Sequence, residues 1–444
     1  MNEKFVHEWG DYPMISKRRI AVLLALFIVV LSIVPAVPAQ ENRTLRVMGW
    51  IGLFEQYLPA WEYMVSEFEA RNPGVTIDYV ATPFEDTLNQ ATTAILGGNA
   101  PDVIQIVSGW SPVLHGLGAL APLDDLLDPA VIEPIPAAML ESATFDDALR
   151  GIPWVPGPIV LVYNRTLLTE AGVDPDAPIE TWADLQAAID AVCALPARAD
   201  GSPVYGLAMR TARNPNSGHW LLPVIWGFGG ELINEDGEVV LNSPESAAAL
   251  QWIQEEVASG CIPNGFNINE TRNTFAQGRA AFIFEGPWAR GNVLTLSDGA
   301  VTVAEDGDVW VSLMPAGPDG NIRQIANNHM LVVTEQSQNK DLAAEFIEFV
   351  TNDPQAVTQY FEVSAQLSTA NMEVLRSGAF AEDEYTQIFV EALNYSNGVP
   401  VKNAQWDAIA DALSLALQEV MNGSDPAASL ENASRVISDL LLYD

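Results

Sequence analysis

The chain has 444 residues, of which 49% are apolar and 18% are charged, and its formal net charge is −38 at pH 7. This composition excludes a disordered chain, and the length favours two domains. The one-sided charge argues against binding to nucleic acid or to anionic lipid headgroups, because both need clustered Lys and Arg side chains.

The first 39 residues have the pattern of an export signal. Lys17, Arg18 and Arg19 precede an apolar run over 20–34, and Ala39 ends a stretch that suits signal-peptidase cleavage. The run is shorter than the roughly 20 residues that span a bilayer. We therefore expect residues 1–39 to direct secretion across the inner membrane, which makes the protein periplasmic or extracellular. Retention at the membrane by an uncleaved signal is the alternative.

The next part of the chain alternates strands with helices. Apolar residues recur with the period of a strand near 44–50, 75–80 and 101–107, and with the period of a helix near 57–68 and 84–95. A β-α-β-α-β order of this kind predicts a parallel sheet flanked by helices.

A Pro- and Gly-rich stretch, GIPWVPGPIVLVYN at 151–164, follows this first body. Proline and glycine are unsuited to a helix interior, and the apolar run after Pro158 predicts a buried strand. We expect the chain to cross here into a second α/β body, with bending confined to a few backbone dihedral angles.

The second body repeats the alternating pattern. Thr181 with Asp184 predicts a capping box, and Ser243 before Pro244 predicts another helix start. A second Pro/Gly-rich stretch near 314–320 predicts a return crossing, and mostly helices follow from 342 onward. We therefore expect an α/β chain of two lobes, each a mixed sheet flanked by helices, with a hinge between them. The expected bounds are 40–155 and 312–336 for lobe 1, and 156–311 and 337–444 for lobe 2.

Two cysteines, Cys193 and Cys261, lie in the exported part of the chain. In an oxidising compartment they either form a disulfide or remain as two small buried thiols.

No motif of a hydrolase, a phosphate-binding loop or a zinc site occurs, so we expect no catalytic residue, no metal and no cofactor. Tryptophan instead recurs where strands are expected to end, at Trp50, Trp110, Trp226 and Trp288. Ligands of open α/β sheets bind outside the carboxyl ends of the strands, and a flat indole suits the C–H face of a sugar ring. Core packing is the alternative for each Trp on its own.

Polar residues stand near the same strand ends and complete the expected ligand site. Their hydroxyl, amide, imidazole and carboxylate groups can form hydrogen bonds with sugar hydroxyls. They are Glu55, Asp86, Ser108, Glu285, Asn328 and His329.

Several segments resemble the extracellular solute-binding proteins of ABC importers, in the sugar-binding group that includes maltose-binding protein. The segments include FEARNPGVTIDYV, GGNAPDVIQI, GIPWVPGPIVLVYNRTLLTEAGVD and FAQGRAAFIFEGPW, in this order. The resemblance implies a two-lobed periplasmic-binding-protein fold of type II that closes on a sugar, with Trp50, Trp110 and Trp288 facing the cleft. It implies ABC permease subunits as partners and a monomer. Many relatives carry a lipidated Cys that this chain lacks, which favours a periplasmic setting.

Two other functions remain open at this stage. The same fold can bind a polyamine or another cation, if carboxylates rather than neutral amides face the tryptophans. A secreted glycoside hydrolase requires two carboxyl groups in the cleft, one of them with a raised pKa.

Overall fold

The structure is a computed structural model that describes residues 42–364, 366–398, 400 and 403–442. The expected signal, residues 1–39, lies outside the described residues. Thr44–Asp444 form one compact unit. In the described part of this chain no helix combines the length and the apolar character needed to cross a membrane.

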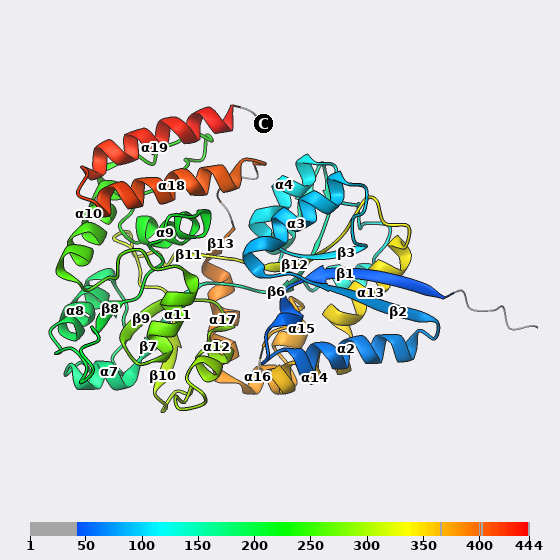
Figure 1. Ribbon diagram of the computed structural model, residues 1–444, viewed down its shortest axis with the longest axis horizontal. Coiled ribbons are helices and arrows are strands. Elements are labelled where there is room, and N and C mark those ends of the chain that lie inside the picture. Colours follow the sequence, from blue (N-terminus) through cyan, green and yellow to red (C-terminus); the bar gives the residue numbers. More distant parts are fainter. Residues whose placement is uncertain (1–41, 365, 399, 401–402, 443–444) are drawn as a thin grey trace, which may run out of the picture. The chain divides into compact units, whose positions relative to one another are not determined.

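The first lobe is built on a five-stranded sheet with the order β2-β1-β3-β12-β6. Its strands are β1 (Arg43–Gly49), β2 (Val75–Ala81), β3 (Val103–Val107), β6 (Ile152–Val155) and β12 (His329–Val333). β1 and β3 run parallel, as the sequence predicts, whereas β12 runs antiparallel to both β3 and β6. A strand from the later part of the chain therefore lies inside the first sheet (Figure 1).

Helices cover this sheet with apolar faces. They are α2 (Leu58–Arg71), α3 (Phe84–Leu96), α4 (Ser111–Gly116), α13 (Lys340–Asn352), α14 (Pro354–Ser364) and α15 (Met372–Leu375). In α2 the side chains of Trp61, Met64 and Phe68 are buried at the spacing that one helical face requires. Phe346 of α13 packs edge-on against Phe68, with ring centroids 5.1 Å apart.

The second lobe is built on a four-stranded sheet with the order β10-β7-β9-β8. Its strands are β7 (Val160–Asn164), β8 (Tyr205–Leu207), β9 (Ala280–Glu285) and β10 (Val309–Ser312). β7 runs antiparallel to β9 and β10, and β8 runs parallel to β9. All of β9 is buried, so the carboxylate of Glu285 at its end needs partners inside the protein.

The helices of the second lobe are α7 (Arg165–Glu170), α8 (Trp182–Cys193), α9 (Pro215–Gly227), α10 (Pro244–Ser259), α11 (Ile268–Ala276), α12 (Ala289–Leu296), α17 (Glu384–Ala392), α18 (Trp406–Met421) and α19 (Pro426–Leu441). Two of these helices, α8 and α10, begin at the caps that the sequence predicts. Both hydrogen bonds of the predicted capping box between Thr181 and Asp184 are present. Ser243 accepts a hydrogen bond from the backbone of Ser246 at the start of α10. α18 packs against α9, α10 and α19 (Figure 1).

Short elements complete the described chain. They are η1 (Ile51–Leu53), η2 (Ser108–Trp110), η3 (Leu393–Tyr395), α5 (Pro129–Ile132), α6 (Ala137–Glu141), α16 (Gly378–Glu382), β4 (Thr144–Phe145), β5 (Ala148–Leu149), β11 (Gln324–Ile325) and β13 (Ser396–Asn397).

Two crossing segments, 156–158 and 326–328, run antiparallel where the chain passes between the lobes. Pro158 pairs with Ala326, and the N–H of Asn327 donates to the carbonyl oxygen of Gly157 at 2.7 Å. A Cβ on Gly157 would lie 2.3 Å from the carbonyl oxygen of Asn327, so this approach requires glycine. A third passage involves α17, because Val390 packs in the first core and Phe389 in a cluster of the second lobe.

The lobe boundaries differ from those expected after residue 311. Met314 and Ile325 lie in the core of the second lobe, so the return crossing is at 326–328. Leu342, Phe346 and Tyr360 lie in the core of the first lobe. This corrects the assignment of 312–325 to lobe 1 and of all of 337–444 to lobe 2, whereas β12 lies in the first sheet as expected. An amphipathic helix shows in its sequence that one face is buried, but not which sheet covers it.

Cys193 and Cys261 form a disulfide that joins the end of α8 to the loop after α10. Their Cα atoms are 5.5 Å apart, within the range that a disulfide requires. Of the two alternatives that the sequence leaves open, the structure therefore shows the disulfide.

Candidate functional site

A cavity of about 340 Å³ lies between the two lobes, beyond the carboxyl ends of β1 and β9. Such a volume lies at the lower end of the range for small-molecule sites. Its lining comes from the first lobe, the second lobe and the hinge, and combines aromatic rings with amides and charged groups. The lining residues are Trp50, Ile51, Leu53, Phe54, Tyr57, Pro83, Phe84, Glu85, Asp86, Arg210, Asn216, Trp220, Ile268, Asn269, Arg272, Trp288, Asn292, Asn327, His329 and Gln366.

Aromatic rings from both lobes meet at this cavity. The ring of Trp50 lies edge-on to those of Phe84, Trp110 and His329, with centroids 5.1, 5.7 and 5.2 Å away. His329 is in turn stacked on Trp288 of the second lobe, at 5.0 Å and an interplanar angle of 10°. The structure thus brings together three of the four tryptophans that the sequence singles out.

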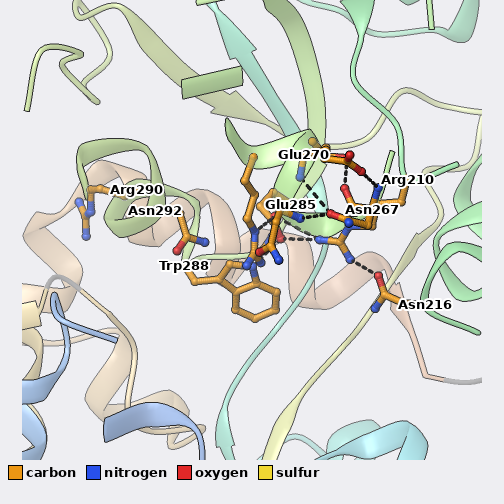
Figure 2. A network of polar contacts seen from close by, with 12 residues as sticks. Arg210, Asn216, Asn267, Glu270, Glu285, Trp288, Arg290 and Asn292 are labelled. Carbon is orange, nitrogen blue, oxygen red and sulfur yellow. Dashed lines mark hydrogen bonds and ion pairs between the residues drawn. The ribbon is translucent and has the colours of Figure 1, made fainter. Parts of the chain in front are cut away.

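The carboxylate of Glu285 organises the second-lobe side of the cavity (Figure 2). It accepts hydrogen bonds from Nη2 of Arg210 at 3.1 and 3.2 Å, from Nε of Arg272 at 2.7 Å and from Nε1 of Trp288 at 2.5 Å. Nη1 of Arg210 donates to Oδ1 of Asn216 at 3.0 Å. Glu285 itself does not line the cavity, but its three partners do, and so does Asn216.

The charges in this network remain at neutral pH. Burial alone would raise the pKa of Glu285, but Arg272 and Arg210 outweigh it and lower that pKa to about 2. Burial lowers the pKa of Arg210 to about 9, against the opposing effect of Glu285. Glu285, Arg210 and Arg272 therefore carry one net positive charge together, since arginine stays protonated in proteins.

Arg272 and Trp220 extend the network toward the cavity. The two Nη groups of Arg272 form no hydrogen bond to the described residues and lie at the cavity wall, so they are available as donors. The guanidinium of Arg210 lies 3.5 Å from the centre of the Trp220 ring. This cation–π contact fixes the orientation of a ring that also lines the cavity.

His329 is a buried neutral imidazole between two indoles. Burial, together with the positive charge of Arg272, lowers its pKa to about 3. Its Nδ1 has no hydrogen-bond partner among the described residues. The ring therefore serves the site as an aromatic surface and a neutral polar group.

Asn328 of the crossing segment 326–328 and Ser108 of η2 lie outside the cavity lining. Oδ1 of Asn328 accepts from the N–H of Gly157 at 3.0 Å, and the N–H of Ser108 donates to the carbonyl oxygen of Asn328 at 2.9 Å. Both side chains are buried. The side-chain oxygen of Asn328 therefore bonds within the chain, whereas Oγ of Ser108 is buried without a hydrogen-bond partner among the described residues.

The remaining expected site residues divide between the cleft, the surface and the core. Asp86 lines the cavity from the first turn of α3. Glu55 is exposed and absent from the lining. Trp226 was expected at a strand end, but it is buried in α9 within the core of the second lobe. The glycines after it end a helix instead of a strand, which corrects this prediction.

Sequence reasoning missed Arg210, Arg272 and Trp220. Arg272 lies in α11 and Arg210 follows β8, so their convergence on Glu285 depends on how distant elements pack. One signal was available, since Glu285 ends an otherwise apolar strand and a buried carboxylate requires cationic partners. In the described residues no group of three or more His, Cys, Asp or Glu side chains is arranged to hold a metal ion.

Comparison with known proteins identifies the family. The profile of the family described as "Bacterial extracellular solute-binding protein" matches residues 53–357. The chain belongs to this family. The resemblance seen in the sequence is therefore confirmed, and the relatives are binding proteins that act outside the cytoplasm.

Named relatives of this solute-binding chain extend along most of its length. It is 20% identical to the maltotriose-binding protein of Pyrococcus abyssi, over 85% of this chain and 77% of that protein. It is 26% identical to the arabinooligosaccharide-binding protein of Halalkalibacterium halodurans, over 77% of this chain and 74% of that protein.

Solved structures confirm the two-lobed binding-protein fold. An ABC transporter solute-binding protein from Thermotoga lettingae, bound with alpha-D-tagatose, has a TM-score of 0.80 at 22% identity, covering 90% of this chain and 100% of that one. The GacH receptor of Streptomyces glaucescens has a TM-score of 0.77 at 24% identity, covering 90% and 98%.

Proposed function

We propose that this solute-binding protein captures a sugar or oligosaccharide in the cleft between its lobes and delivers it to the membrane subunits of an ABC importer. The observation that carries the proposal is the composition of the cavity. Indoles of Trp50 and Trp288 stand beside unengaged guanidinium donors of Arg272 and the amides of Asn269 and Asn292.

A sugar ring has an apolar C–H face and an equatorial rim of hydroxyl groups. Indoles can pack against the face, while guanidinium and amide groups form directional hydrogen bonds with the rim. Closure of the lobes around the ring buries these hydroxyl groups, so each donor left unpaired would cost affinity. Such a site discriminates between epimers by its polar groups.

The charges of the cavity favour a sugar over a cation. Arg210 and Arg272 line it together, and their net positive charge repels a polyamine or quaternary amine. The carboxylates of Glu85 and Asp86 are exposed rather than enclosed with the aromatic rings.

The carboxylate of Glu285 is unsuited to acid catalysis of glycoside hydrolysis. A general acid requires a raised pKa, whereas the arginines lower the pKa of Glu285 to about 2. Incubation with chromogenic glycosides should release no chromophore, and release in proportion to protein concentration would establish hydrolysis instead.

The relatives support the same solute class and setting. Two of them are named for oligosaccharides, and structures of others contain alpha-D-tagatose or acarbose. We further propose a permease partner, a periplasmic or extracellular location after secretion directed by residues 1–39, and action as a monomer without cofactor.

Thermal-shift measurements with a sugar panel test the proposal. The panel contains D-glucose, D-galactose, D-xylose, L-arabinose and their di- and trisaccharides, with spermidine and choline as cationic probes. A sugar present at about 100 times its Kd should add roughly 2.7 kcal/mol to the free energy of unfolding. Stabilisation by spermidine or choline alone, or by none of the sugars, would overturn the proposal.

The variant Arg272→Gln tests the site itself, with Arg279→Gln as the matched control. Arg279 lies on the surface and its guanidinium bonds to Gln277. Loss of the Arg272 donors should weaken sugar binding about tenfold or more, because hydrogen bonds to charged groups contribute about 1.5–3 kcal/mol. Equal affinities for both variants would exclude Arg272 from the site.

A further inference from the structure

The hydroxyl group of Tyr385 in α17 forms hydrogen bonds on both sides of Trp288 in the chain. It donates to the carbonyl oxygen of Pro287 at 3.1 Å and accepts from the N–H of Arg290 at 3.0 Å. We propose that Tyr385 is a positioning residue for the solute site, which holds the indole of Trp288 at the cavity wall without touching the solute. The inference rests on the proposed function and adds to it a residue that lies outside the cavity lining.

Burial makes the hydroxyl group of Tyr385 a well-defined contact. Tyr385 is 3% exposed, and its ring packs against those of Phe389 and Trp310, with centroids 5.0 and 6.1 Å away. Burial raises the pKa of the phenol, so the hydroxyl stays protonated and can donate one hydrogen bond while it accepts another. Removal of the hydroxyl would take a hydrogen bond from each of two backbone groups that flank Trp288, where little water can replace it.

These backbone contacts fix the direction in which the indole leaves the chain. The carbonyl of Pro287 belongs to the planar peptide group that precedes Trp288, so its orientation constrains the backbone at Trp288. The ring is held separately, because its Nε1 donates to Glu285 at 2.5 Å. Trp288 is therefore anchored at two points, at the backbone by α17 and at the indole by β9.

An ion pair joins α12 and α17, which lie side by side, next to this contact (Figure 1). Nη1 and Nη2 of Arg290 donate to the two carboxylate oxygens of Asp383 at 2.8 and 3.1 Å, and the guanidinium lies 4.4 Å from the centre of the Tyr385 ring. Asp383 also caps α17 by accepting from the N–H of Thr386 at 3.0 Å. Burial would raise the pKa of Asp383, but hydrogen bonds with Arg290 lower it, so the pair stays charged at neutral pH.

A further contact binds α17 to the first lobe. Nε2 of Gln387 donates to the carbonyl oxygens of Leu375 and Phe380 at 3.0 and 2.8 Å, and both of these residues lie in the core of the first lobe. The place of Trp288 relative to the first lobe matters, since its ring stacks on His329 of β12 at 5.0 Å. α17 thus connects the segment that carries this indole to the lobe that supplies its aromatic partner.

Tyr385→Phe tests the inference, because it removes the hydroxyl group and keeps the ring. The protein is labelled with 5-fluorotryptophan, and the fluorine NMR signals of Trp288 and Trp154 are identified as those missing from Trp288→Phe and Trp154→Phe. In the solute-free protein, Tyr385→Phe should shift or broaden the signal of Trp288, whereas the signal of Trp154, buried in the first core, should stay in place. A loss of global stability alone would leave the signal of Trp288 in the folded protein unchanged.

Isothermal titration calorimetry with the mono-, di- and trisaccharides of the thermal-shift panel gives a second readout. Each sugar that binds the wild type should bind Tyr385→Phe about three to ten times more weakly, as expected for the loss of one neutral hydrogen bond. Tyr360→Phe is the matched control. Tyr360 is likewise buried, but its hydroxyl has no hydrogen-bond partner among the described residues, so its removal should change neither the affinities nor the signal of Trp288.

Asp383→Asn is a second variant that tests the same role if Tyr385→Phe does not fold. Asparagine keeps the helix cap but removes the charge that holds Arg290, so the signal of Trp288 should move and sugar affinity should fall about threefold. A signal of Trp288 that neither variant moves, or affinities equal to those of Tyr360→Phe, would overturn the positioning role. If the wild type binds no sugar of the panel, the proposed function fails, whereas the signal of Trp288 in the solute-free protein still decides whether Tyr385 positions the indole.

Discussion

Replacement of Glu285 by Gln removes the carboxylate that faces Arg210 and Arg272 in the second lobe. Glu285 is 1% exposed and Arg210 is 4% exposed, so neither charge can return to water without local unfolding. Glutamine keeps the size and one acceptor oxygen, and the variant therefore changes charge far more than shape. Arg210 and Arg272 would then face each other as like charges.

The expected loss follows from this burial. Removal of one partner from a buried ion pair costs about 3–5 kcal/mol, because the remaining charge is left uncompensated. At about 2–4 °C per kcal/mol for a domain of this size, the melting temperature of the second lobe should fall by roughly 6–20 °C. Differential scanning calorimetry measures the transition directly.

Glu170→Gln is the control for this experiment. Glu170 pairs with Arg198 on the surface of the same lobe, with 41% and 34% of the side chains exposed. Such pairs contribute about 0–1 kcal/mol, so this variant should melt within a few degrees of the wild type. Equal shifts for both variants would refute the view that Glu285 holds the cleft together.

The pH dependence gives a second check on the same carboxylate. The pKa of Glu285 falls from its ordinary 4.5 to about 2 in the folded chain. Its contribution to stability is therefore complete above about pH 4.5 and is lost as the pH falls toward 2. The difference in melting temperature between wild type and Glu285→Gln should be constant near neutrality and shrink below pH 4.5. A difference that persists at pH 2 would contradict the assignment.

Three further predictions concern the hinge, the disulfide and the buried imidazole. Gly157→Ala should lower the free energy of unfolding by about 1–3 kcal/mol and weaken sugar binding, because its Cβ meets a carbonyl oxygen at 2.3 Å. Gly398→Ala should change neither, because an added Cβ there meets no atom of the described residues within 4 Å apart from its chain neighbours; equal effects in calorimetry would refute the hinge argument. Replacement of Cys193 and Cys261 by Ser should cost about 4 kcal/mol, since they close a loop of 68 residues; a melting temperature that is insensitive to dithiothreitol would contradict this. The pKa of His329 is lowered to about 3 in the folded chain, so the contribution of its neutral imidazole to the free energy of unfolding should be lost as the pH falls below about 6.5. The melting temperature of the wild type should therefore fall below pH 6.5, and that of His329→Gln should fall less steeply. An unchanged slope would show that the imidazole is not held neutral.

The sequence predicted local features of the fold well. Strands β1, β2 and β3, the capping box of Thr181 and the first crossing near Gly157 depend on neighbouring residues, which the sequence displays directly. Trp50 and Trp288 were expected at the ligand-binding edge because the topology of a sheet determines at which edge its parallel strands end. The place of β12 in the first sheet and of α13 in the first core depends on long-range packing, which periodicity does not encode.

The distinction between local sequence and long-range packing also explains which site residues could be predicted. Arg272 was invisible as a site residue because an arginine in a short polar helix is ordinarily solvated. Its role depends on Glu285, thirteen positions later and on another element. Trp226 shows the opposite error, since an aromatic residue followed by glycines resembles a strand end, yet α9 continues through Pro223 to Gly227.

The contacts of Glu285 also affect how much side-chain conformational entropy is lost when a solute binds. One carboxylate fixes the rotamers of Trp288, Arg210 and Arg272 before any solute arrives. Immobilising three such side chains during association would otherwise cost about 1.5–4.5 kcal/mol, and here that ordering has already occurred in folding. The same contacts therefore make the second lobe rigid and strengthen binding, so a substitution that removes them should weaken both.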